Sequence, residues 1–123
     1  MSDGSEQYQH KPMTRFIARF AVFFGTEEQK LMKDYAVNIS TGGIFLETNN
    51  ILPVDTPLFV EFLLPGKDTP IACNARVSWT NGPIELKKAL LPPGMGLQFL
   101  DLSLEDLHAI REFLDQGDLL PTL

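Results

Sequence analysis

A basic stretch near the N-terminus contains the residues best suited to hold an anion. Lys11, Arg15 and Arg19 lie in a segment that has no acidic residue between Glu6 and Glu27. The whole chain has a net charge of −6, so this positive charge is a local concentration. Guanidinium and ammonium groups gathered in this way can bind a small anionic ligand even on an acidic protein.

A second polar segment, Asn38-Ile39-Ser40-Thr41-Gly42-Gly43, carries complementary chemistry. The Asn38 amide can pair with the polar edge of a base, and the Ser40 hydroxyl can donate a hydrogen bond. Gly42 and Gly43 have no side chain, so a ligand can approach the backbone closely there. The same residue types also form an ordinary tight turn, and both interpretations stay open.

Six short strands and one late helix are needed to position these segments. Residues rich in Phe, Ile and Val, separated by turn formers, predict strands over 16–24, 31–39, 44–48, 58–64, 71–79 and 96–100. Leu104, Leu107, Ile110 and Leu114 recur at helical spacing, which predicts a helix over 103–116. Ser103 with Asp106 is typical of a helix start, and Gly117 of a helix end.

Alternation assigns the faces of the strands. In the first strand Phe16, Ala18, Phe20, Val22 and Phe24 share one face, so Arg19 lies on the other and is expected to face solvent. In the second strand, Leu31, Tyr35, Val37 and Ile39 are expected on one apolar side. In the fifth strand, Cys73 and Trp79 belong to an apolar face that is expected to be buried.

Turns about every ten residues favour a mostly β protein, an antiparallel six-stranded barrel with a C-terminal α-helix over one end. The expected division is a flexible N-terminal arm over 1–14, a barrel with its helix over 15–117, and a short tail over 118–123. The arm contains few apolar residues and is therefore expected to be mobile in the free protein.

Composition argues against several classes of function. No nucleophile with a base, paired-carboxylate motif or phosphate loop is present in the sequence, which predicts no enzymatic activity. One cysteine and two distant histidines give no metal-ligand spacing. The acidic balance disfavours DNA or RNA binding. No apolar run is long enough to span a bilayer, so a cytoplasmic protein without membrane insertion is expected.

The polar segment in its context resembles the PilZ domain family. It fits the pattern (D/N)-x-S-x-x-G and continues as Gly43-Ile44-Phe45-Leu46, as family members do. The late Gly94-Met95-Gly96-Leu97-Gln98-Phe99 resembles the family's last strand. The resemblance covers roughly residues 11–114 and implies the PilZ-like split-barrel fold with a C-terminal helix.

The family's second motif, R-x-x-x-R, has two competing registers in this chain. Arg15 and Arg19 match it by letter, but Arg19 then falls inside the first strand. In typical members the second arginine directly precedes that strand, which favours Lys11 and Arg15 as the equivalents. Lysine offers only a point charge, whereas arginine binds bidentately and stacks on a base.

The resemblance implies a receptor for the second messenger cyclic di-GMP, with no other cofactor. Its ligand residues would be Arg15, Asn38, Ser40 and Gly43, with Lys11, Arg19 and Gly42 as further candidates. The ligand would order the N-terminal arm and thereby present a surface to a protein of motility, pilus, chemosensory, biofilm or virulence pathways. The alternative is a ligand-independent module that binds a motility or pilus protein with the same barrel.

Overall fold

The structure, a computed structural model, describes residues 14–82, 91–116 and 119–122. Its strands and helix are, in order, β1 (Phe16–Gly25), β2 (Met32–Ile39), β3 (Gly43–Glu47), β4 (Pro57–Phe62), β5 (Ile71–Asn81), β6 (Gly94–Phe99) and α2 (Leu104–Asp115). The strands close a barrel in the order β1-β2-β3-β6-β5-β4, and every neighbouring pair is antiparallel. The predicted six-stranded barrel with one C-terminal helix is confirmed.

The interior of the barrel is filled by the alternate residues of its strands. On β1 the predicted face is confirmed, with Ala18, Phe20, Val22 and Phe24 buried and Arg19 facing outward. Three phenylalanines from different strands meet inside. The ring centroids of Phe20 and Phe62 are 5.3 Å apart, and those of Phe62 and Phe99 are 5.9 Å apart. Such tilted and stacked pairs add to the gain from burying the rings themselves.

The predicted apolar face of β2 is wrong. Leu31 and Tyr35 are exposed and Val37 is half-buried; of the four predicted residues Ile39 is in the core, together with Ala36, which was not predicted there. A register shift between Ala36 and Asn38 interrupts the pairing of β2 with β3. An extra residue at such a bulge moves the following side chains to the other face. After the bulge Ile39 faces the barrel core opposite Ile44, and Asn38 lies on the outer face with its partners Phe45 and Ile17.

Trp79 also departs from the predicted core of β5, while Cys73 is buried as expected. A register shift between Val77 and Trp79 takes the indole out of the barrel interior. Its ring packs instead on Phe45, with centroids 5.1 Å apart. Phe45 lies between two core residues of β3 and so points to the outer face.

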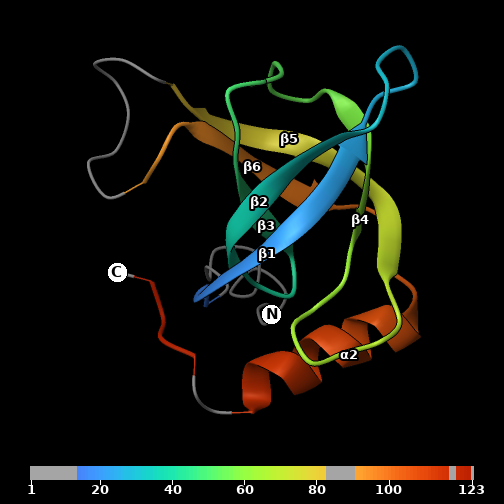
Figure 1. Ribbon diagram of the computed structural model, residues 1–123, viewed down its shortest axis with the longest axis vertical. Helices are drawn as coiled ribbons and strands as arrows, with labels where there is room; N and C mark the ends of the chain where they lie inside the picture. Colours follow the sequence, from blue (N-terminus) through green and yellow to red (C-terminus); the bar gives the residue numbers. More distant parts are fainter. Residues whose placement is uncertain (1–13, 83–90, 117–118, 123) are drawn as a thin grey trace, which may run out of the picture.

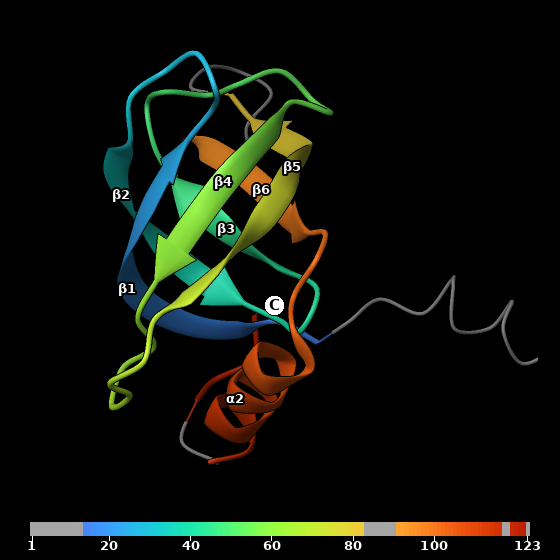
Figure 2. The same ribbon diagram turned by 90° about the vertical axis from the view of Figure 1, so that its right-hand side faces the viewer.

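The helix α2 lies across one end of the barrel, and the β1–β2 turn lies at the opposite end (Figures 1 and 2). Ile110 and Phe113 bury the inner face of the helix in the barrel core. A bond of 3.0 Å between Lys67 Nζ and Glu112 Oε1 joins the helix to the β4–β5 loop. No helix among the described residues is long and apolar enough to cross a membrane.

The predicted N-cap of α2 is present, and removing it should weaken the protein measurably. The Ser103 hydroxyl accepts a hydrogen bond of 3.0 Å from the Asp106 amide. We expect Ser103→Ala to lower the free energy of unfolding by about 1 kcal/mol, as measured by denaturant unfolding. Ser103→Asp retains an acceptor and should stay near the wild type. Equal stability of the two variants would show that the cap contributes nothing.

A side-chain bridge ties β5 to the segment before α2 and should make stability depend on pH. Asp101 accepts a hydrogen bond from the backbone amide of Asn74 at 2.7 Å and another from the Asn74 side-chain Nδ2 at 2.8 Å. These bonds, the side-chain bond first, hold the pKa of Asp101 below its usual value. A lowered folded-state pKa stabilises the fold above the unfolded pKa, and that stabilisation is lost as pH falls through the folded pKa.

We therefore expect Asp101→Asn to flatten the loss of stability on acidification below about pH 4, the usual range of an aspartate. The variant should also be weaker at neutral pH, because its amide cannot accept both bonds. Asp115→Asn is the control, since the Asp115 carboxylate has no hydrogen bond within the described part of the chain. An acid limb that is unchanged in Asp101→Asn would contradict this account.

Candidate ligand-binding site

A hydrogen bond between Arg15 and Asn38 lies at the centre of the candidate site. Arg15 immediately precedes β1, and Asn38 stands near the end of β2. Antiparallel pairing of Ile17 with Asn38 brings the two segments together. Arg15 Nη1 donates to Asn38 Oδ1 at 2.7 Å. Two candidate residues that are 23 positions apart in the sequence are therefore in direct contact.

The surroundings of this pair are only partly open to solvent. Asn38 is 5% exposed and Arg15 is half-buried. Burial lowers the pKa of the Arg15 guanidinium, which stays charged at neutral pH because its ordinary pKa is so high. A guanidinium removed from bulk water interacts more strongly with an anion than an exposed one does. The bond of Arg15 to Asn38 was not anticipated from the sequence, which assigned the amide to a ligand.

Arg19 is directed to a different environment. Its Nη1 lies 3.0 Å from Glu47 Oε1, and its Cζ lies 4.8 Å from the ring centroid of Tyr35. The Arg19 side chain is 60% exposed on the outer face of the barrel. The structure thus brings Arg15, and not Arg19, to Asn38. Lys11, the other residue of the competing register, lies outside the described residues.

Ser40 takes part in the turn that joins β2 to β3. Its hydroxyl accepts a hydrogen bond of 3.1 Å from the Gly42 amide, and its own amide donates to the Gly43 carbonyl at 2.9 Å. The side chain is 2% exposed. These contacts give Ser40 a structural role in shaping the turn.

The glycines of the motif have close backbone contacts with β6. A Cβ at Gly43 would lie 1.9 Å from the Leu97 carbonyl oxygen. The Gly42 carbonyl accepts a hydrogen bond of 2.9 Å from the Phe99 amide. The absence of a side chain at Gly43 is therefore required by the pairing of β3 with β6. This packing requirement exists with or without a ligand.

The C-terminal residues pair with the beginning of β1, which the sequence did not predict. The Thr122 amide donates to the Arg15 carbonyl at 2.9 Å, and the Ile17 amide donates to the Leu120 carbonyl at 2.7 Å. Phe16 and Pro121 form an isolated antiparallel bridge between them. The tail thus holds the backbone from which the Arg15 side chain projects. Backbone pairing of this kind needs no side-chain pattern, so the sequence gives no signal for it.

The remaining polar residues form no second centre of chemistry in the described ranges. No group of three or more His, Cys, Asp or Glu residues there could hold a metal ion. Burial, together with the charges of Asp101 and Asp106, raises the pKa of Cys73 to about 12, so its thiol is protonated and unreactive. His108 is exposed and lies 3.8 Å from Glu112 on the same helix.

A closed six-stranded antiparallel barrel with a helix across one end, and an arginine bonded to Asn38 near the end of the second strand, defines a small β-barrel domain. The model of the PilZ domain family matches residues 14–116, and the chain belongs to this family. No curated protein matches the chain.

A solved structure with a similar fold is that of the Bacillus subtilis inhibitor of motility, MotI/DgrA. The TM-score is 0.67 and the sequence identity is 24%. The match covers 85% of this chain and 49% of the other, so this chain spans about half the length of that protein. At this identity the similarity establishes the fold alone.

Proposed function

We propose that this chain is a cyclic di-GMP receptor that relays the level of the messenger to motility, pilus, biofilm or virulence machinery. The observation that carries the proposal is the 2.7 Å contact between Arg15 and Asn38. It joins a charged donor and an amide from two segments at one end of the barrel. Membership of the PilZ family makes a cyclic dinucleotide the first ligand to test.

The chemistry of Arg15 suits this ligand. A guanidinium has five N–H donors, and the bond from Nη1 to Asn38 leaves others for a phosphate or a guanine edge. Its planar face can also stack on a base. Holding the guanidinium in place beforehand reduces the entropy that binding must overcome. Asn38 then acts by orienting Arg15, and its Nδ2 group stays available as a donor to the base edge.

The relay would work through the N-terminal arm. In the sequence, residues 1–14 lie directly before Arg15, and Arg15 is followed by β1. A ligand held by Arg15 and by Lys11 would contact the arm and the barrel together, and would order one against the other. The arm and barrel would then present a joint surface to a protein partner. The name of the structurally similar inhibitor of motility supports a motility protein as that partner.

A ligand-independent interaction module is the second candidate. Asn38 Oδ1 already accepts a bond from Arg15, and Ser40 and Gly43 have structural roles in the turn. A relative that binds no nucleotide would keep these residues for the sake of the barrel.

Isothermal titration of the purified chain with cyclic di-GMP separates the two candidates. A receptor should give a dissociation constant well below about 100 μM, equivalent to roughly 5.5 kcal/mol. Weaker binding, or no heat of binding in a folded sample, would favour the interaction module. GTP at the same concentration is the matched control, because it shares the base and phosphates but not the cyclic dinucleotide shape.

A further inference from the structure

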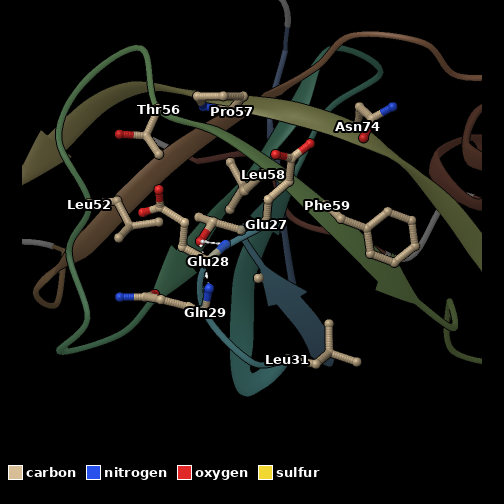
Figure 3. Close-up of a pocket in the computed structure, with 12 residues that line it drawn as sticks. Glu27, Glu28, Gln29, Leu31, Leu52, Thr56, Pro57, Leu58, Phe59 and Asn74 are labelled. Atoms are coloured by element: carbon tan, nitrogen blue, oxygen red, sulfur yellow. Dashed lines mark hydrogen bonds between the residues drawn. The ribbon is translucent and has the colours of Figure 1, made fainter.

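A pocket of about 750 Å³ opens at the end of the barrel that carries the β1–β2 turn. It lies between that turn and the start of β4, with Asn74 of β5 at its edge (Figure 3). The β1–β2 turn is at the opposite end from α2 (Figures 1 and 2). A pocket of this volume is large enough for several side chains or a small ligand. It is separate from the Arg15–Asn38 site.

The charge of this pocket is entirely negative. Glu27 and Glu28 are the only charged residues in its lining, and both are exposed. In residues 14–82, 91–116 and 119–122 neither carboxylate has a hydrogen bond or an ion pair. The turn that carries them is held by Thr26 Oγ1, which accepts bonds from the amides of Glu28 at 3.3 Å and Gln29 at 3.1 Å. Two carboxylates without an ion pair in these ranges therefore stand beside the pocket, with the exposed Lys30 following them in the same turn.

Large apolar side chains lie next to these acids. Leu31 is 55% exposed and Phe59 is 39% exposed, and both line the pocket. Phe23 on the outer face of β1 is also exposed and is a diagonal neighbour of Phe59, with Glu61 and Lys33 as its direct partners on β4 and β2. Large exposed apolar side chains beside charged groups are typical of an interaction site.

We propose that this pocket, with its Glu27 and Glu28 carboxylates and its Leu31 and Phe59 side chains, binds a basic segment of a partner protein that carries a large apolar side chain. A Lys or Arg side chain of the partner would pair with the carboxylates. Its charge can also lie over the ring of Phe59, a favourable cation–π position. The neighbouring apolar side chain of the segment would cover Leu31.

Charge complementarity selects this occupant. An acidic segment would be repelled by Glu27 and Glu28, and a purely apolar segment would leave both acids unpaired in the interface. A small polyamine could satisfy the acids but would leave Leu31 and Phe59 in water. A basic segment with an apolar side chain satisfies both. The surface does not involve Arg15 or Asn38, so this inference does not depend on binding of cyclic di-GMP.

The test uses the whole chain without nucleotide and a short synthetic peptide of Arg, Lys and Leu with blocked ends. Amide chemical shifts are followed during titration. We expect saturable shifts at Thr26–Leu31 and Thr56–Phe59. A peptide with Glu in place of Arg and Lys, and one with Ser in place of Leu, should each bind at least threefold more weakly.

The double variant Glu27→Gln/Glu28→Gln should weaken binding of the basic peptide roughly three- to tenfold, as two exposed ion pairs are lost. Glu105→Gln/Asp115→Asn changes the net charge equally on the helix at the other end of the barrel and should leave binding unchanged. An equal loss in both double variants would indicate general charge attraction and overturn the proposal. So would saturable shifts confined to other elements, or no saturable shift at all.

Discussion

Replacing Arg15 by alanine should lower the affinity for cyclic di-GMP roughly ten- to a hundredfold. Removing a charged hydrogen bond to a phosphate or guanine typically costs about 1.5–3 kcal/mol, which corresponds to that change in the dissociation constant. Arg15 is the guanidinium that the structure places against Asn38, at 2.7 Å. Titration calorimetry measures the change, after a thermal melt has shown that the variant is folded.

Arg19→Ala is the matched control, because Arg19 bonds to Glu47 on the outer face of the barrel. It should change the affinity little. In the register that pairs Lys11 with Arg15, Lys11→Ala should weaken binding and Lys11→Arg should tighten it, since arginine restores the bidentate donor. Loss of binding in Arg19→Ala with full binding in Lys11→Ala would show that the register pairing Arg15 with Arg19 is the functional one.

Replacing Gly43 by alanine should destabilise the fold by about 3 kcal/mol or more, at the upper end of what overpacking costs. The new Cβ would lie 1.9 Å from the Leu97 carbonyl oxygen, so the backbone of β3 or β6 must move. Both strands are paired on each side in the closed barrel, and a shift of one strand disturbs its neighbours. For a domain whose total stability is about 5–15 kcal/mol, this loss should be plain in a denaturant melt.

Gly82→Ala is the control, because a Cβ at Gly82 would meet no atom of the described residues within 4 Å. Its stability should stay within about 0.5 kcal/mol of the wild type. If Gly43→Ala were as stable as Gly82→Ala, the glycine would not be required by strand packing. Its role would then have to be sought in contact with a ligand.

The alternation of apolar residues was sufficient to predict the barrel and the buried face of β1, because one face of that strand is uniformly apolar. It failed on β2 and at Trp79, where register shifts move side chains to the other face. Single extra residues of this kind are set by the pairing of neighbouring strands, which alternation within one strand does not contain. On β2 the shift places Asn38 on the outer face, opposite Ile17 and Phe45, and Ile39 in the core.

The contact between the two candidate residues Arg15 and Asn38 was not predicted from the sequence. Sequence spacing preferred the register that pairs Lys11 with Arg15 over the one that pairs Arg15 with Arg19, and the structure places Arg15, which belongs to both, beside Asn38. The bond between them depends on the pairing of β1 with β2, and the support of Arg15 by the tail depends on residues more than 100 positions away. Neither of these contacts produces a pattern in the sequence around Arg15. The assignment of Arg15, Asn38, Ser40, Gly42, Gly43 and Lys11 to a ligand stays a prediction.

The most direct test of the receptor function is to follow backbone amide shifts of the whole chain during titration with cyclic di-GMP. The Arg15–Asn38 site predicts saturable shifts at Arg15–Ile17 and Asn38–Gly43, with none at the Thr26–Leu31 turn at the far end of the barrel. Shifts that saturate elsewhere would contradict the site. If no shift saturates up to about 100 μM ligand, the dissociation constant is above that value, which corresponds to a binding free energy weaker than roughly 5.5 kcal/mol. That result would contradict the receptor function itself.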